Sequence, residues 1–277
     1  MSSLWGAPPW IMGILNATPD SFSGDGLGTD HGALLERARR QLADGAAILD
    51  VGGESTRPGA ESVGPATELA RAIPLVEALR VVTIPISIDT SRAVVAEAAL
   101  RAGAVIVNDV SGFADPELPR VAAEYGAWLV AMHNGWTRKD QGAGDVVERV
   151  SAVLAALVAD AMRAGVAPDR VIVDPGIGFG KTTAESLTLV RRLGELRARF
   201  PRNRLLVGPS RKRFIGETLG LDVGERLEGT LAIVSLAVAA GADIVRVHDV
   251  AAAVRAARMA SAVVTDAGST RRIVRDP

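Results

Sequence analysis

The residues best suited to binding and catalysis follow short apolar runs, and segment 50–59 is the richest of these. It comes directly after the apolar residues 46–49 and contains adjacent glycines, two hydroxyl residues, an arginine and a proline. Glycines let backbone amides approach a ligand closely, and a guanidinium binds an oxyanion through two parallel hydrogen bonds. The segment therefore predicts a phosphate-binding loop. Taken alone, a glycine–proline turn with an exposed arginine explains it equally well.

Three acceptor side chains follow other apolar runs. Asp89, Asn108 and Asp174 offer carboxylate and amide oxygens together with one amide donor. Such a set suits a flat heterocycle that carries amino and ring N–H groups. For each residue alone, a helix cap or a turn is the more common explanation.

A second set is cationic. Arg57, Arg246 and His248 supply charged donors, and Asn16 adds a neutral oxygen. These types suit a diphosphate and a hard divalent ion. Lys212 is long enough to reach a carbonyl or a carboxylate. We expect Arg246 and His248, which end the last apolar run, to lie away from the acceptor set.

The chain offers no pattern for covalent catalysis. We find no Ser-His-Asp order, no metal-binding pair of histidines and no obvious nucleophile. Segment 175–182 is similar to a phosphate-binding P-loop but has Pro175 where that motif needs glycine. The chemistry predicted is therefore binding and electrostatic stabilisation.

The elements that must position these residues alternate along the chain. Eight short apolar runs are predicted as strands: 10–15, 47–51, 84–88, 105–107, 128–132, 171–173, 205–207 and 244–247. Helical periodicity lies between them: 34–42, 69–79, 94–100, 146–162, 187–196 and 227–238. Two helix starts are also predicted, one capped by Asp115 before Pro116, the other by a capping box of Thr182 and Glu185.

Five glycines are predicted to end helices shortly before a strand: Gly45, Gly103, Gly126, Gly165 and Gly241. Strands and helices that alternate through short links require parallel strands. Eight such units predict one α/β domain, a single (β/α)8 TIM barrel with a core of about 10–265 and a polar tail at 266–277. The active site of such a barrel lies at the C-terminal strand ends, where all the polar groups above converge.

Composition excludes several other classes. The 277 residues are 48% hydrophobic with a net charge of −1, so no basic field indicates a nucleic-acid partner. The chain has no cysteine, which excludes disulfides and thiolate metal sites. No signal peptide and no membrane-spanning stretch are predicted, and we expect a cytoplasmic protein.

Seven ordered motifs carry a resemblance to a known family: 12–23, 52–59, 87–90, 108–112, 174–181, 210–212 and 246–249. With these motifs the chain resembles the dihydropteroate synthases from residue 12 to about residue 259. That family joins 6-hydroxymethyl-7,8-dihydropterin pyrophosphate to p-aminobenzoate in folate synthesis. The resemblance implies Mg²⁺ as cofactor, small-molecule substrates and a homodimer.

The resemblance also implies a role for each strand-end residue. The pterin would be held by Asp89, Asn108, Met132, Asp174 and Lys212. The pyrophosphate would be held by Asn16, Arg57, Arg246 and His248, with Asn16 also a ligand of the metal. The p-aminobenzoate would be framed by Phe22, Thr56, Pro58, Phe179, Ser210 and Lys212. Six charged residues would be catalytic: Arg57, Asp89, Asp174, Lys212, Arg246 and His248.

Two positions depart from the family pattern, Gly24 in the first loop and Pro209 before the Ser-Arg-Lys motif. Neither removes a functional group. Two other functions remain as alternatives, a methyltransferase that acts on methyltetrahydrofolate and a non-catalytic paralogue. The cationic set argues against the first, and the retention of the phosphate ligands argues against the second.

Overall fold

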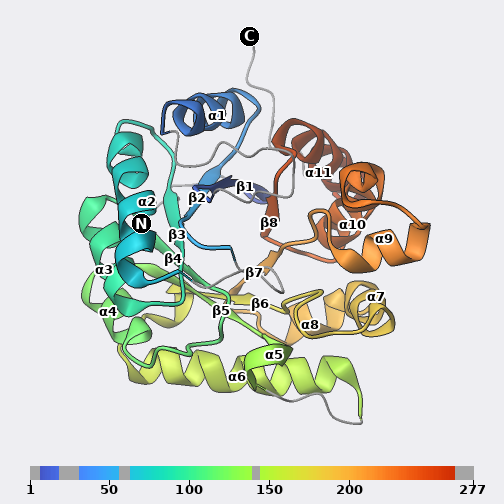
Figure 1. The fold of residues 1–277 in the computed structure, drawn as a ribbon. Helices are drawn as coiled ribbons and strands as arrows, with labels where there is room; N and C mark the ends of the chain where they lie inside the picture. Colours follow the sequence, from blue (N-terminus) through green and yellow to red (C-terminus); the bar gives the residue numbers. More distant parts are fainter. Residues whose placement is uncertain (1–6, 19–30, 56–62, 139–143, 266–277) are drawn as a thin grey trace.

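Eight parallel strands close into a barrel in their chain order, β1 to β8, and helices surround the barrel (Figure 1). In the computed structural model the described residues are 7–18, 31–55, 63–138 and 144–265. The strands are β1 Trp10–Asn16, β2 Ile48–Gly52, β3 Ile86–Asp89, β4 Ile106–Asp109, β5 Trp128–Met132, β6 Val171–Asp174, β7 Arg204–Val207 and β8 Ile244–Val247. The predicted (β/α)8 barrel is therefore confirmed.

The helices fill the links between strands and form the outer ring in Figure 1. They are α1 His31–Ala43, α2 Pro65–Leu79, α3 Ala93–Ala102, α4 Leu118–Glu124, α5 Gly135–Arg138, α6 Val146–Arg163, α7 Thr183–Arg191, α8 Leu193–Arg199, α9 Arg213–Leu219, α10 Leu227–Ala239 and α11 Val250–Val264. Two short 3₁₀ turns are η1 Pro168–Arg170 and η2 Val223–Glu225. Among the described residues, no helix combines the length and apolarity needed to cross a bilayer.

Two helix predictions were wrong in detail. The single helix predicted at 187–196 is two helices, because Arg192 leaves helical geometry at φ −107° and ψ 20°. The helix predicted to be capped by Asp115 begins later, at Leu118. One Asp115 oxygen accepts from the Glu117 amide at 3.1 Å, and the other accepts from the Ala93 amide at 2.8 Å. Its carboxylate thus joins a turn before α4 to the start of α3.

The five predicted glycine turns are all present. Their φ angles are positive: Gly45 95°, Gly103 122°, Gly126 58°, Gly165 101° and Gly241 89°. Residues with a Cβ adopt this region at a cost, so glycine is the residue that reverses the chain from helix to strand at least strain.

The core has two parts because successive strand residues point to opposite faces. Eight apolar side chains fill the inside of the barrel: Trp10, Met12, Ile48, Ile106, Val130, Ile172, Leu206 and Ile244. The intervening strand residues, such as Leu49 and Val107, pack outward against the helices. In several strands, the residue two positions beyond the inner apolar residue also points inward and lies near the C-terminal end of the strand. In β2, β4, β6 and β8 that position holds a polar residue, and these positions form the candidate site.

Candidate active site

An ion-pair network links four strands across the top of the barrel interior. The Arg246 guanidinium donates through Nε to Asp50 Oδ2 and through a terminal nitrogen to Asp89 Oδ2, both at 2.6 Å. Asn108 Nδ2 also donates to Asp50 Oδ2, at 3.0 Å. The second oxygen of each carboxylate, Oδ1, is buried without a hydrogen-bond partner among the described residues. Two orphaned acceptors in a buried network suit a ligand that brings N–H donors.

The expected separation of Arg246 from the acceptor set is therefore wrong. β8 and β2 both pair with β1, so their inward-pointing residues meet across one strand although 196 positions separate Asp50 and Arg246. Burial raises the pKa of Asp89; Arg246 opposes this rise, and the nearby Asp50 carboxylate adds to it.

Asp174 ends β6 on the same inner surface. Its Oδ1 accepts from the Gly176 amide at 2.7 Å, and burial raises its pKa to about 6 against the lowering effects of that hydrogen bond and of Lys212. Met132 on β5 is in register with Asp174 and fully buried. A buried carboxyl beside a methionine can bind the edge of a flat ring while the thioether covers its face.

Lys212 reaches the site from the loop after β7. Its ammonium lies 3.7 Å from the centre of the Phe179 ring, a cation–π contact. Burial lowers the pKa of Lys212, opposed by the Asp174 carboxylate. The structure thus brings together three residues predicted from sequence: Asp174, Phe179 and Lys212.

Ser210 and His248 join the ends of β7 and β8. The Ser210 hydroxyl lies 2.8 Å from His248 Nδ1 and accepts from the His248 amide at 3.2 Å. Between Ser210 and Lys212, Arg211 has a left-handed backbone with φ 55° and donates twice to the Asp249 carboxylate, at 3.1 and 2.8 Å. The middle residue of the Ser-Arg-Lys motif therefore anchors the loop, and its two neighbours face the site.

Asn16 is half-buried at the end of β1, in register with Gly52. A Cβ built on Gly52 would lie 3.5 Å from both Asn16 Oδ1 and Asp89 Cβ, so the missing side chain leaves space between them. The described residues contain no group of three His, Cys, Asp or Glu able to hold a metal. Within the part of the chain that the structure describes, a metal held by Asn16 would need further ligands from water or substrate.

Four predicted site residues, Phe22, Thr56, Arg57 and Pro58, lie outside the described residues, as does the predicted tail at 266–277. Their placement stays a prediction.

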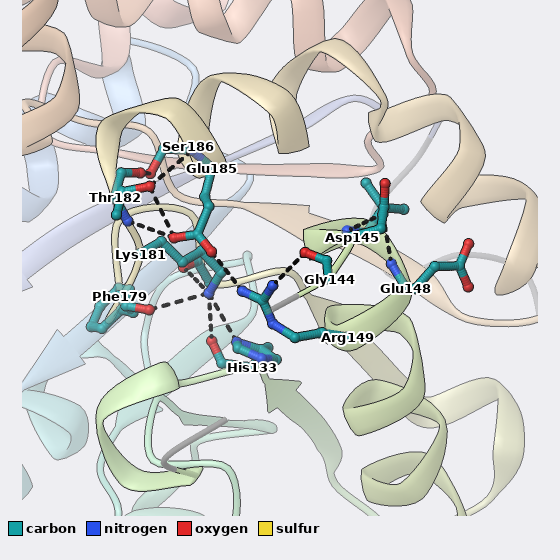
Figure 2. Close-up of polar contacts among 12 residues, drawn as sticks. His133, Gly144, Asp145, Glu148, Arg149, Phe179, Lys181, Thr182, Glu185 and Ser186 are labelled. Atoms are coloured by element: carbon teal, nitrogen blue, oxygen red, sulfur yellow. Dashed lines mark hydrogen bonds and ion pairs between the residues drawn. The ribbon is translucent and has the colours of Figure 1, made fainter. Parts of the chain in front are cut away.

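The loop from β6 to α7 is held by a lysine to which the sequence analysis gave no role (Figure 2). Lys181 is buried, and its ammonium contacts His133 Nδ1 at 2.9 Å and the carbonyls of Gly176 and Phe179 at 2.8 and 3.1 Å. The P-loop alternative is thereby excluded, because this lysine binds the protein's own backbone. The capping box of Thr182 and Glu185 is confirmed.

Asp50 was also missed, although it opens the first segment considered. A fully buried carboxylate inside a strand is costly unless it is paired, so an aspartate flanked by apolar strand residues was itself a clue. Its partner, Arg246, was not predictable, because it lies 196 positions further along the chain.

Comparisons with known proteins agree with the geometry. The family model for pterin-binding enzymes matches residues 12–248. The dihydropteroate synthase of Synechocystis sp. is 48% identical, over 94% of this chain and 91% of its own length. The structure of Xanthomonas albilineans dihydropteroate synthase in complex with 7,8-dihydropteroate is 37% identical with a TM-score of 0.83, covering 94% of this chain and 95% of that one. A Mycobacterium tuberculosis protein named inactive dihydropteroate synthase 2 is 43% identical, over 91% of this chain and 82% of its own length. With eight strands closed around this polar site and a family match over most of its length, the chain belongs to the pterin-binding enzymes.

Proposed function

We propose that this chain catalyses the dihydropteroate synthase reaction with the strand-end residues in the roles set out below. The reaction condenses 6-hydroxymethyl-7,8-dihydropterin pyrophosphate with p-aminobenzoate, giving 7,8-dihydropteroate and pyrophosphate. The observation that carries the assignment of roles is the buried network of Arg246, Asp50, Asp89 and Asn108 with its two orphaned carboxylate oxygens.

The pterin is bound by the acceptors on the inner surface. Asp89 Oδ1 has no hydrogen-bond partner in the part of the chain that the structure describes, and Asp174 lies two strands beyond Asn108, so ring N–H and amino groups find acceptors on two sides. Met132 packs on the ring, and Lys212 binds its carbonyl edge. A donor-rich heterocycle would therefore satisfy groups that are costly to leave buried and unpaired.

The diphosphate is bound by Asn16, Arg246, His248 and, outside the described residues, Arg57. The Arg246 guanidinium is already oriented by two carboxylates, so it needs little rearrangement to meet an anion. Asn16 would hold Mg²⁺ together with the diphosphate, which is the usual way in which this ion binds with few protein ligands. When bound, Mg²⁺ neutralises negative charge on the departing diphosphate.

The p-aminobenzoate is bound beside Phe179, Ser210 and Lys212, together with Phe22, Thr56 and Pro58 outside the described residues. The Phe179 ring offers an aromatic face and the Lys212 ammonium offers a partner for the carboxylate. The cation–π contact between them holds both in place before the substrate arrives.

The reaction needs no covalent enzyme intermediate. The bond between the pterin methylene carbon and the diphosphate oxygen breaks, and its electron pair leaves with the diphosphate. The carboxylates of Asp89 and Asp174 stabilise the positive charge that develops on the pterin. The neutral arylamine forms the new C–N bond through its lone pair and then releases a proton to solvent, so no general base is required.

The test is direct. Protein, pterin pyrophosphate, p-aminobenzoate and Mg²⁺ are mixed, and dihydropteroate formation is followed. One relative of comparable identity is named inactive, so the assay needs a control that shows the background level of product. The Asp174→Asn variant serves as that negative control. Absence of product from the unaltered chain, with substrates bound, would assign it to the inactive relatives.

The homodimer predicted from the resemblance has a candidate interface. Helices α10 and α11 pack against each other and expose large apolar side chains, namely Leu236, Met259, Val263 and Val264. Such exposure over neighbouring helices is typical of a protein–protein contact. Light scattering of the unaltered chain and of Leu236→Asp tests it, since a dimer through this face becomes a monomer in the variant.

A cytoplasmic location also stays a prediction.

A further inference from the structure

The Lys181 ammonium is buried, and within the described residues it contacts backbone carbonyls and a histidine ring nitrogen. Three contacts within the described residues are short enough for hydrogen bonds from its three protons: the Gly176 carbonyl at 2.8 Å, His133 Nδ1 at 2.9 Å and the Phe179 carbonyl at 3.1 Å. The His133 carbonyl lies further away, at 3.4 Å. No step of the proposed reaction needs this arrangement, and Figure 2 shows the side chain directed into its own loop.

The loop tied by Lys181 packs tightly on the segment after β5. A Cβ built on Gly176 would lie 1.9 Å from the His133 carbonyl oxygen, and one on Gly180 would lie 2.6 Å from the Gly135 carbonyl carbon. The Gly135 amide also donates to the Phe179 carbonyl, at 3.3 Å. Backbone segments in such close contact restrict the loop to one conformation. This conformation is stable because the Lys181 ammonium donates hydrogen bonds to the backbone carbonyls that point toward it.

This arrangement sets the direction of the Phe179 side chain. The Phe179 carbonyl is fixed by both Lys181 and Gly135, so the ring extends to the opposite side. There it meets the Lys212 ammonium at 3.7 Å and the Trp136 ring edge-on at 5.6 Å between centroids.

We propose that Lys181 is a positioning residue for the p-aminobenzoate pocket, acting through the Phe179 carbonyl and ring on Lys212. This rests on the proposed role of Phe179 and deepens it. Lys181 touches no substrate and takes no part in bond making. It fixes the aromatic wall and, through that wall, the cation that binds the carboxylate.

The charge of Lys181 adds a second effect. It lowers the pKa of Asp174 and also the pKa of Lys212, in each case alongside Arg246. Removing the charge therefore raises the pKa of both groups. His133, directly after β5, is a titratable group in contact with the ammonium.

Two variants separate charge from hydrogen bonding. Lys181→Met removes both, whereas Lys181→Gln removes the charge and keeps an N–H donor. We expect the KM for p-aminobenzoate to rise about tenfold in Lys181→Met and less in Lys181→Gln. The KM for the pterin pyrophosphate should rise by a smaller factor, because only some of its proposed ligands, such as Asp174 and Lys212, lie beside this loop, whereas Asp89 and Asn108 lie on β3 and β4.

The matched control is Arg149→Met. Arg149 lies in the same neighbourhood and donates to Glu185 at 2.6 Å and to the Gly144 carbonyl at 2.9 Å, without contacting Phe179 (Figure 2). It should lower the melting temperature and leave the KM for p-aminobenzoate unchanged. If Lys181→Met and Lys181→Gln behave like this control, Lys181 is only structural and the proposal fails.

A double-mutant cycle with Phe179→Leu tests the route. If Lys181 acts through Phe179, then Lys181→Gln has little further effect on the KM for p-aminobenzoate in the Phe179→Leu background. Full additivity would overturn the proposal. No change in this KM for Phe179→Leu alone would instead remove Phe179 from the pocket, which is a failure of the proposed function and not of the lysine's contacts.

The pH profile supplies a readout that a purely structural role leaves unmoved. Both limbs of kcat/KM should shift to higher pH in Lys181→Gln, because both Asp174 and Lys212 lose a neighbouring positive charge. Limbs that stay in place, together with an unchanged KM, would overturn the proposal.

Discussion

The two halves of the barrel interior are built on the same strands and differ in every property that matters for function. In the N-terminal half, eight apolar side chains fill the space, and all of them except Trp10 have no exposed surface. Two residues further along, the inward positions of β2, β4 and β8 hold Asp50, Asn108 and Arg246.

The upper half keeps polar atoms that no group in the described ranges satisfies. The described residues have six buried side-chain atoms without a partner, and three of them, on Asp50, Ser87 and Asp89, lie on β2 and β3. An unpaired buried polar atom costs about 1–3 kcal/mol. The lower half therefore stabilises the fold, and the upper half retains unsatisfied groups for a ligand.

Breaking the ion pair in the upper half should have the largest effect. Arg246→Met leaves the Asp50 carboxylate buried without its cationic partner and should cost about 3–5 kcal/mol of unfolding free energy. Activity should be lost as well, because the same guanidinium meets the diphosphate. Urea denaturation and the synthase assay measure the two effects.

A companion variant checks the cause. Adding Asp50→Asn to Arg246→Met removes the stranded charge, so part of the stability should return while activity stays absent. Wild-type stability in Arg246→Met alone would show that the pair is not buried as the structure has it.

Truncation in the lower half should separate stability from function. Ile106→Ala opens a cavity in the apolar interior and should cost about 2–5 kcal/mol. At temperatures where the variant is folded, its kcat and KM values should match the unaltered chain. Val94→Ala, at an exposed position on α3, is the control and should cost less than about 0.5 kcal/mol. A large rise in the KM for pterin in Ile106→Ala would mean that the two halves are not energetically separable.

At Asp174 the opposite result is expected, a loss of pterin binding with little loss of stability. Asp174→Asn replaces a charged acceptor by an amide with a misplaced donor and should weaken pterin binding by about 2–4 kcal/mol. Stability should change far less, since the carboxyl is already costly to ionise where it lies. Calorimetry with a pterin ligand measures it, with Asp160→Asn on the exposed surface of α6 as control. Unchanged affinity would remove Asp174 from the pocket.

The smallest effect should be a pH dependence that has opposite signs for pterin binding and for folding stability. The pKa of Asp174 is about 6 in the free protein, and a ligand that donates to its carboxylate lowers that pKa. Pterin affinity should therefore hold above about pH 6 and fall below it by up to about tenfold per pH unit.

The contribution of Asp174 to stability runs the other way. Its folded pKa is raised, so this contribution is present near pH 4 and is lost as the pH rises through about 6. Calorimetry and denaturation from about pH 5 to about pH 8 test both signs, and Asp174→Asn should flatten both curves. Pterin affinity that rises on acidification would contradict the assignment.

Much of this architecture was predictable because it depends on local sequence patterns. Strand positions follow from apolar runs such as 171–173, and the helix ends follow from glycines whose left-handed φ angles the structure confirms. Motifs at the strand ends named Asp89, Asn108, Asp174 and Lys212 before any fold was known. Alternation of strands and helices then placed these residues at one end of a barrel.

The break at Arg192 and the late start of α4 were not predictable in the same way. Asp115 has the sequence of a helix cap, yet its carboxylate is shared between α3 and the turn before α4. Which amides the Asp115 carboxylate binds depends on how α3 and α4 pack, and a local sequence pattern does not contain that information.

The sequence by itself determined which residue types stand at the strand ends, and only the tertiary structure decided which of them meet. Asp50 and Arg246 are 196 positions apart and form a pair because barrel closure brings β8 beside β1 and β1 beside β2. Lys181, which belongs to a glycine-rich motif typical of phosphate binding, turns inward because backbone carbonyls brought together by two loops surround its ammonium. Coulomb attraction and hydrogen bonding act over a few ångströms of space, whatever the distance along the chain, so these partners are fixed only once the barrel closes.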